Sequence, residues 1–168
     1  MMLSTIERKA PNRDSLISCN ITVFLAGSIE MGTASPWQQE LVKQFPIGIN
    51  FLNPLRDNWD SSWVQELNCP NFYEQVTWEL DMLDRADIIP VYFDPNTKSP
   101  ITLLELGLHA FDVDYAGRPK LIVCCPDGYW RKGNVDIVCQ RYGIPVFSNK
   151  ETWMVALKNR MQLIKTRV

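Results

Sequence analysis

The sequence predicts an α/β fold: a flavodoxin-like or Rossmann-like three-layer sandwich built on a five-stranded parallel sheet. Short apolar runs rich in β-branched residues alternate along the chain with longer amphipathic stretches. This alternation is typical of βαβ units, whose strands pair in parallel and are covered by helices on both faces. Right-handed crossovers then leave only a few possible strand orders. The chain has 168 residues, which fits a single domain of this kind.

Five short apolar runs are predicted to be the buried strands. They are too short for buried helices, and polar residues, glycine or proline bound them. They comprise residues 21–26, 49–52, 88–93, 121–125 and 144–147. Residues 1–20 mix charged and polar side chains and are expected to form a loose N-terminal extension, with residues 21–168 as the single domain.

Two of the predicted helices begin at serine–proline pairs. In Ser35-Pro36 and in Ser99-Pro100, the serine is expected to be the N-cap and the proline the first helical residue. A further helix is predicted from residue 72 to about residue 85, and two more over residues 134–142 and from residue 151 onward. Apolar periodicity places four side chains of the helix at 72–85 on its buried side: Phe72, Val76, Leu80 and Leu83.

The composition excludes several classes of protein. The net charge is −2 and there is no run of Lys or Arg, so a nucleic-acid partner is not expected, and a small, roughly neutral ligand fits better. The five cysteines are odd in number and contain no C-x-x-C pair, which indicates a reducing compartment, the cytoplasm, and neither a disulfide framework nor a zinc site. Because His109 is the single histidine, a His-based metal centre or a Ser-His-Asp triad is not expected. No apolar run reaches the roughly 18 residues of a membrane span, and no signal-peptide core is present.

Three loops follow the carboxyl ends of the first three predicted strands, where open α/β sheets bind their ligands. These loops are residues 27–33, 53–63 and 94–99, and they contain glycines, aromatic side chains and carboxylates. None of them contains G-x-G-x-x-G or G-x-x-x-x-G-K, so neither a dinucleotide nor a P-loop nucleotide is expected, and no cofactor is predicted. Glu30 in the first loop would repel a phosphate.

Glu105 is the residue most indicative of chemistry. It lies one to two turns into a predicted helix whose neighbouring positions are mainly Leu, Ile and Gly. A carboxylate in such surroundings needs a partner or a function, because burying an unpaired charge is costly. The alternative is a partly exposed acid that pairs with a neighbouring side chain.

Six short segments, in order, resemble the nucleoside 2-deoxyribosyltransferase family over about residues 21 to 147. They are residues 23–28 (VFLAGS), 53–59 (NPLRDNW), 78–80 (WEL), 86–87 (AD), 99–107 (SPITLLELG) and 131–134 (RKGN). The resemblance implies that Glu105, in the E-L-G segment, attacks the anomeric carbon of a 2′-deoxynucleoside and displaces its base. A second base then attacks the resulting deoxyribosyl ester, so the configuration is retained, as in a retaining glycosidase.

The resemblance also suggests which acids protonate the leaving base. Glu79 takes the place of the family's base-binding aspartate, so Glu for Asp is a departure from the family pattern; the alternative for Glu79 is a surface acid. Asp81 lies two residues on, points to a different side of the helix and ranks lower. Asp94 is the acid of the loop before the nucleophile helix, where it could either act in catalysis or cap the turn made with Pro95 and Asn96.

The remaining residues of the expected site would bind substrate. Phe24 occupies the place of a family tyrosine and cannot donate its hydrogen bond, so Ser28 or Tyr92 would have to orient Glu105, unless Phe24 is simply core. Three side chains of the second loop are suited to reading and stacking a base, although its tryptophan could equally be a surface residue: Asp57, Asn58 and Trp59. Gly27 and Ser99 are expected to line the same site.

Asn134 corresponds to a family asparagine that reaches the sugar 5′-hydroxyl from a neighbouring subunit. The resemblance therefore implies a homo-oligomer, a dimer or a hexamer of dimers, that acts on deoxynucleosides and free nucleobases. Asn134 and Glu30 both favour a nucleoside over a 5′-nucleotide, whereas Arg131 and Lys132 keep the nucleotide alternative open. Two other functions stay possible: an N-glycosidase of the same fold, and a non-catalytic nucleoside sensor.

Overall fold

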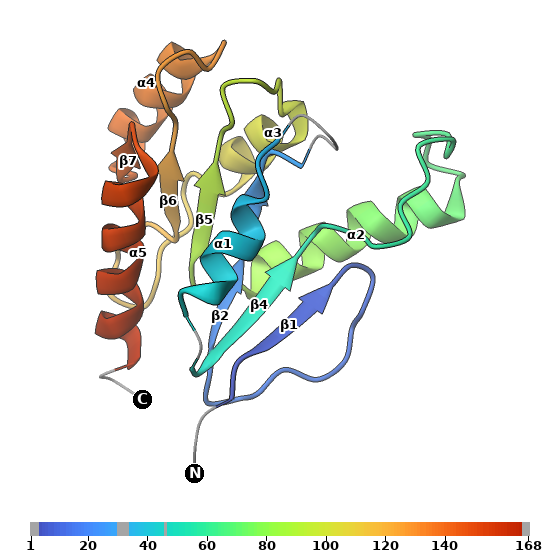
Figure 1. Cartoon of the computed structure of the whole chain (residues 1–168), viewed down its shortest axis with the longest axis horizontal. Coiled ribbons are helices and arrows are strands. Elements are labelled where there is room, and N and C mark those ends of the chain that lie inside the picture. Colours follow the sequence, from blue (N-terminus) through green and yellow to red (C-terminus); the bar gives the residue numbers. More distant parts are fainter. Residues whose placement is uncertain (1–3, 30–33, 46, 166–168) are drawn as a thin grey trace.

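The structure is a computed structural model that describes residues 4–29, 34–45 and 47–165. From residue 26 onward its strands and helices alternate, as predicted, after two strands in the N-terminal part (Figure 1). In chain order the elements are β1 (Ile6–Lys9), β2 (Ile21–Phe24), β3 (Ala26–Gly27), α1 (Trp37–Lys43), β4 (Ile49–Asn53), α2 (Pro70–Arg85), β5 (Ile89–Tyr92), α3 (Pro100–Leu108), β6 (Leu121–Cys124), α4 (Lys132–Tyr142), β7 (Val146–Phe147) and α5 (Lys150–Lys165).

The strands form two parallel sheets instead of the single five-stranded sheet that was predicted. One has the order β1-β4-β2 and the other the order β3-β5-β6-β7. The predicted strand over residues 21–26 divides between them: Leu25 N donates to Leu52 O of β4 at 2.9 Å, and Phe24 N donates to Ile88 O at 3.1 Å. The segment therefore lies between the two sheets, with β4 on one side and Ile88 and β5 on the other, and the α/β class with parallel strands is confirmed. The arrangement is consistent with a flavodoxin-like fold.

The N-terminal segment is part of the sheet, and its prediction as a loose extension was wrong. β1 pairs in parallel with β4, from Ile6 opposite Asn50 to Lys9 opposite Asn53. Beyond the strand, Ala10 N donates to Asn53 O at 3.1 Å. The sequence of β1, Ile-Glu-Arg-Lys, has no apolar run because the strand lies at the edge of its sheet, where charged side chains discourage further pairing.

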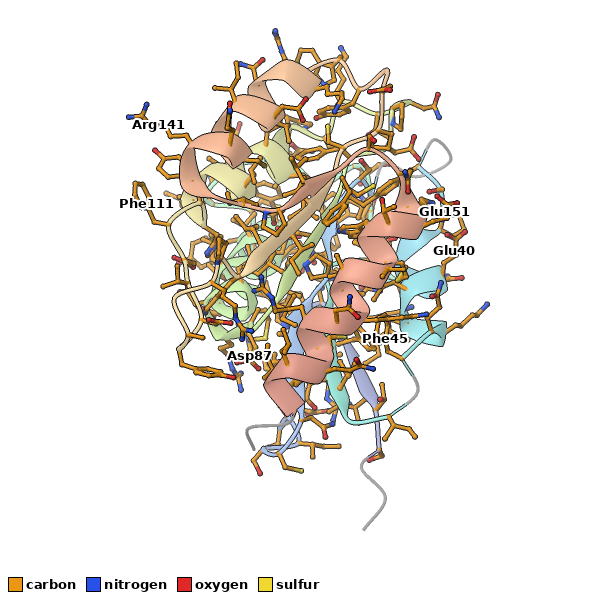
Figure 2. All side chains as sticks on the ribbon, turned by 90° about the vertical axis from the view of Figure 1, so that its left-hand side faces the viewer. Glu40, Phe45, Asp87, Phe111, Arg141 and Glu151 are labelled. Carbon is orange, nitrogen blue, oxygen red and sulfur yellow. The ribbon has the colours of Figure 1, made fainter. Side chains whose placement is uncertain are left out.

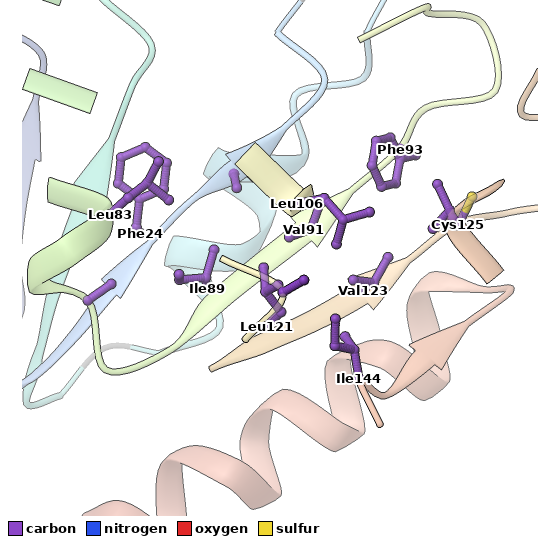
Figure 3. Packing of buried hydrophobic residues seen from close by; sticks show 14 of the residues in the cluster. Phe24, Leu83, Ile89, Val91, Phe93, Leu106, Leu121, Val123, Cys125 and Ile144 are labelled. Carbon is purple, nitrogen blue, oxygen red and sulfur yellow. The ribbon is translucent and has the colours of Figure 1, made fainter. Parts of the chain in front are cut away.

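Two hydrophobic clusters cover the two faces of the strands. One contains side chains of α2, α3 and α4 and alternate strand residues such as Val91 and Val123; Figure 3 shows Leu106 of α3 and Leu83 of α2 within it. The other contains side chains of α1 and α5, with Trp37 and Trp153 fully buried. Figure 2 shows α5 lying across this second face beside α1. The molecule therefore has three layers, and α2 and α3 share one side of the strands.

The helices agree with the predicted ones in place and differ in detail. In α2 the buried side chains are Gln75, Trp78, Met82 and Leu83, whereas Leu80 is 42% exposed, so its predicted burial was wrong. The helix is turned so that the indole of Trp78 lies inside, and its Nε1 donates to Asn12 O at 2.8 Å. The N-terminal segment that was left out of the predicted domain thus supplies a hydrogen-bond acceptor to the buried side of α2.

Neither serine of the serine–proline pairs caps its helix with its side chain. Pro36, and not Ser35, is the N-cap residue of α1. Ser99 does precede α3, but its backbone is left-handed (φ 45°) and no side-chain cap bond forms. Among the described helices, none is long and apolar enough to cross a membrane.

Candidate active site

Glu105 lies on the inner side of α3 together with Leu106, whereas three other apolar residues of the helix are exposed: Ile101, Leu104 and Leu108. The Glu105 side chain is buried, with 8% of the residue exposed, whereas Leu104 and Leu108 are 59% and 55% exposed. This is the reverse of a solvated surface acid on an amphipathic helix. The alternative of a partly exposed, paired acid does not apply, because none of the described residues forms a hydrogen bond or ion pair with the Glu105 carboxyl group.

A second carboxyl group lies near Glu105. Burial, and to a lesser extent the charge of Glu79 on α2, together raise the pKa of Glu105 to about 8. Burial likewise raises the pKa of Glu79 to about 7, against the opposing effect of a hydrogen bond from Gln75. Two acids that disfavour each other's ionisation titrate as a pair, so the pair retains a proton near neutral pH. Such a pair can supply one anionic and one protonated carboxyl group to a reaction.

Gln75 holds Glu79 in place. Its Nε2 donates to Glu79 Oε1 at 2.8 Å and to Pro54 O at 2.9 Å. Gln75 is 4% exposed, and sequence reasoning missed it. The available signal was its position on the same side of α2 as Trp78 and four residues before Glu79, one turn away along the helix.

The loops after β3 and β5 are joined by a buried cluster of hydroxyl groups. Ser28 Oγ lies 2.7 Å from Thr97 Oγ1 and 2.6 Å from Ser99 Oγ, and it accepts a hydrogen bond from Asp94 N at 2.8 Å. These loops lie where the chain switches from one side of the strand order to the other, the usual ligand position in such folds. The hydroxyl groups are satisfied by one another, which ties the two loops together at the edge of the site.

Neither Ser28 nor Tyr92 orients Glu105, contrary to the expectation from the sequence. The Ser28 hydroxyl is used within its own cluster. The Tyr92 ring lies on the opposite face of the strands, 5.8 Å from the Trp37 ring and 6.1 Å from the Trp153 ring. Phe24 is fully buried in the cluster that contains α2 and α3, in agreement with its reading as a core residue.

Gly27 is required by the fold itself. Its φ is +150°, and a Cβ at this position would lie 2.5 Å from Tyr92 O and 2.8 Å from an atom of the Trp37 ring. The close approach expected of this glycine is therefore to the neighbouring strand β5. Any side chain here would force β3 away from β5 and displace Ser28 at the adjacent position.

Asp94 is committed to the loop that follows β5. Its Oδ1 accepts from Asn96 N at 2.9 Å and from Asn96 Nδ2 at 3.1 Å, and its Oδ2 accepts from Ser35 N at 3.0 Å. Burial raises the pKa of Asp94, but these hydrogen bonds outweigh it and hold the pKa below its usual value. An anion with these bonds is suited to capping the turn, one of the two roles expected for Asp94, and is poorly suited to donating a proton.

The loop between β4 and α2 is built around Arg56, which sequence reasoning also missed. Its guanidinium group lies 4.9 Å from the centre of the Trp63 ring, and its Nη2 lies 3.1 Å from Glu74 Oε2. Its Nε donates to Asn58 Oδ1 at 2.8 Å, so Asn58 supports the arginine. The Trp59 and Trp63 rings meet edge to face at 5.2 Å. Arg56, Trp59 and Trp63 therefore form a cluster of one cation and two aromatic rings beside the first turns of α2.

Asp57 is not part of this cluster. It is exposed and forms an ion pair with Lys9 at the end of β1. Asp57 and Asn58 line a cavity of about 390 Å³ together with residues of the N-terminal segment: Glu7, Lys9, Ala10, Pro11 and Asn12. Because that segment was expected to lie outside the domain, its contribution to a cavity at this edge could not be predicted.

Comparison with known proteins identifies the family. A family profile described as "Nucleoside 2-deoxyribosyltransferase like" matches residues 20–129, which include both Glu79 and Glu105. The chain belongs to this family. The search among curated proteins found no match. A solved structure titled "conserved protein from Enterococcus faecalis" is similar, with a TM-score of 0.58 and 14% identity over 84% of this chain and 99% of that chain, and this likeness concerns the fold alone.

Two expected site residues of this deoxyribosyltransferase-like domain have surroundings that do not include Glu105. Asp81 is exposed and forms an ion pair with Arg13 at 2.6 Å. Asn134, which lies beyond the segment matched to the family, is exposed and lines a cavity of about 340 Å³ between α3 and α4. Glu105 is not among the residues that line this cavity: Leu103, Leu106, Gly107, Arg131, Asn134, Val135 and Val138.

The charges near Asn134 are partly neutralised. Arg131 lies over the Trp130 ring at 4.2 Å. Lys132 Nζ donates to Cys125 O at 3.1 Å and lies 3.1 Å from Asp136 Oδ2. Lys132 is therefore engaged within the fold, which weakens its case as a phosphate ligand. Glu30, expected to repel a phosphate, lies outside the described residues.

Proposed function

We propose that this protein transfers 2-deoxyribose between purine or pyrimidine bases through a covalent ester with Glu105. The observation that carries the proposal is the burial of the Glu105 carboxyl group beside that of Glu79, with leucines on the exposed side of the same helix. Membership of the nucleoside 2-deoxyribosyltransferase-like family supports the same reaction class.

In the first step, a Glu105 carboxylate oxygen bonds to C1′ of the sugar and the C1′–N bond to the base breaks. The bonding electrons leave with the base, and protonated Glu79 supplies the proton that the base nitrogen needs. In the second step, a nitrogen of another base attacks C1′, the ester bond breaks, and Glu79 takes the proton that this base releases. Two inversions at C1′ give net retention of configuration.

The burial of the two acids serves both steps. A carboxylate removed from water is a stronger electrostatic partner for the positive charge that develops on the sugar. Because the pKa of Glu79 is raised to about 7, a large fraction of this acid is protonated at neutral pH. The raised pKa of Glu105 means that substrate binding must favour the state in which the single proton of the pair resides on Glu79.

Product analysis tests the proposal. With thymidine and adenine as substrates, deoxyadenosine and thymine are expected to form, and a Glu105→Ala variant is expected to form neither. Free deoxyribose in place of deoxyadenosine would make the protein an N-glycosidase, with water as acceptor. Ligand binding without any turnover by the wild-type protein would instead favour a sensor and contradict the proposal.

The oligomer proposed from Asn134 is supported by the outer surface of α3, where Ile101, Leu104 and Leu108 are more than half exposed. A second copy of the chain covering this surface would bring its Asn134 toward the neighbouring site. Mixing Glu105→Ala and Asn134→Ala subunits should restore about a quarter of the wild-type rate, because half of the dimers are mixed and one of their two sites has both residues. An active monomer in sedimentation would contradict this assembly. A cytoplasmic location is proposed because all five cysteines are free.

A further inference from the structure

The side-chain amide of Gln75 can adopt only one orientation in this structure. Pro54 O lies 2.9 Å from the amide, and a carbonyl oxygen can only accept a hydrogen bond. The amide atom that faces Pro54 must therefore be the nitrogen. Turning the amide over would bring two carbonyl oxygens together in a buried position and leave Pro54 O without this donor.

The second hydrogen of the same nitrogen is directed at Glu79. Nε2 of Gln75 lies 2.8 Å from Glu79 Oε1, so this carboxyl oxygen accepts a hydrogen bond in either protonation state. In a protonated carboxyl group the carbonyl oxygen is the better acceptor and the hydroxyl oxygen carries the proton. The contact with Gln75 therefore favours the proton on the other oxygen, Oε2.

We propose that Gln75 is a positioning residue that fixes the acid proton of Glu79 on Oε2, from which it passes to the leaving base. This inference rests on the proposed function, because it assigns an atom to the proton donor of that reaction. Nothing in the family match assigns a role to Gln75, which stands on α2 one turn before Glu79.

The surroundings of Glu79 leave Oε2 available. Among the residues that the structure describes, only Gln75 hydrogen-bonds to the Glu79 carboxyl group. The charged group of α3 that interacts with Glu79 is Glu105. Arg56, the cation of the adjoining loop, is held by Glu74 and Asn58. A proton on Oε2 is thus not drawn into another hydrogen bond of the described structure.

The anchor for this arrangement comes from a different element. Pro54 directly follows β4, whose five residues are all buried. Gln75 therefore ties the acid on α2 to the end of a sheet strand, and the position of the carboxyl group follows the rigid part of the fold. One N–H group of the buried Gln75 nitrogen bonds to Pro54 O, and the other holds Glu79 Oε1.

The test compares two leaving groups in a Gln75→Met variant, which keeps the length of the side chain and removes both donors. The substrates are 2′-deoxyguanosine, whose base must be protonated to leave, and 7-methyl-2′-deoxyguanosine, whose cationic base leaves without a proton. We expect kcat on 2′-deoxyguanosine to fall roughly 10- to 100-fold, a part of the usual contribution of an acid catalyst. The kcat on the methylated substrate is expected to stay within a factor of about three. Gln140→Leu, an exposed change on α4, is the control.

The pH dependence of kcat distinguishes this positioning role from a purely structural role of Gln75, which would leave the pH profile unchanged. The Gln75 hydrogen bond lowers the pKa of Glu79, so its removal should raise that pKa and keep the acid protonated to higher pH. The alkaline limb of the kcat profile on 2′-deoxyguanosine should therefore move to higher pH in Gln75→Met. Equal losses on both substrates, or an unmoved alkaline limb, would overturn the proposal.

A direct titration separates this inference from the proposed function. Glutamate labelled with ¹³C at the carboxyl carbon can be followed by NMR, with the Glu79 signal assigned from its loss in Glu79→Gln. A raised Glu79 pKa in Gln75→Met would support the hydrogen-bond assignment even if the wild-type protein turned over neither substrate. An unchanged Glu79 pKa would overturn it whatever the activity.

Discussion

The replacement Glu105→Gln should stabilise the fold, and the gain should grow with pH. A buried acid whose pKa is raised in the folded state holds its proton more tightly there than in the unfolded chain. Its ionisation therefore costs stability as the pH rises from the usual value, 4.5, through about 8. This difference in pKa corresponds to about 5 kcal/mol at full ionisation. Most of that cost, about 4 kcal/mol, is added between pH 5 and pH 9.

Urea unfolding measures this difference directly. Trp37, Trp78 and Trp153 are fully buried, so their fluorescence should report the loss of the folded state. The free energy of unfolding of Glu105→Gln minus that of the wild type is expected to be near 1 kcal/mol at pH 5 and several kcal/mol larger at pH 9. The control is Glu151→Gln, at an exposed position, with an expected change within about 0.5 kcal/mol at either pH. A difference that does not vary with pH, or a loss of stability at pH 9, would refute the reasoning.

The other predictions concern the pair of acids, the loops and the excluded candidates. The pH profile of kcat/KM should be bell-shaped with a maximum near neutral pH. In Glu79→Gln the alkaline limb should disappear, because the acid that titrates there is gone. The acid limb should move to lower pH, because losing the Glu79 charge lowers the pKa of Glu105. Gly27→Ala should lower the free energy of unfolding by about 3 kcal/mol, since its Cβ would lie 2.5 Å from Tyr92 O; a change below 1 kcal/mol in urea titration would count against that contact. Asp81→Ala should leave kcat/KM within a factor of about two, since its carboxylate pairs with an exposed arginine. Trp59→Ala should raise KM about tenfold if its ring stacks on the base, and an unchanged KM would remove it from the site.

The alternation of strands and helices was predictable because each buried strand is a continuous apolar run. The strands over residues 49–52 and 121–125 were predicted to within one residue of β4 and β6. β1 could not be found in this way, because its burial is partial and its sequence is mostly charged. Its place in the sheet depends on pairing with β4, a long-range contact that leaves no local pattern.

The division of the first strand was also invisible in the sequence. Residues 21–26 form one apolar run, yet within it β2 pairs with β4 and Ala26 pairs with β5. The sequence specifies that this segment is buried, and only the register of its neighbours decides where it changes partner.

Within the site, the acid in an apolar helix left two interpretations open: a carboxyl group with a function, or a partly exposed acid that pairs with a neighbour. The structure buries Glu105, while Leu104 and Leu108 face outward. The sequence could not show which polar side chains hydrogen-bond to the acids and which hydrogen-bond between the loops. Ser28 and Asp94 are residue types that often occur in active sites. In the structure, hydrogen bonds to loops distant in sequence use their side chains to hold those loops together.

Intact mass spectrometry after mixing the protein with thymidine tests the central claim most directly. Rapid acid quenching should reveal a deoxyribosyl adduct on the chain, and peptide mapping should place it on Glu105. The Glu105→Gln variant, with the same shape and no nucleophilic oxygen anion, should show none. An adduct on a different side chain, or rapid turnover with no adduct at any quench time, would contradict the account.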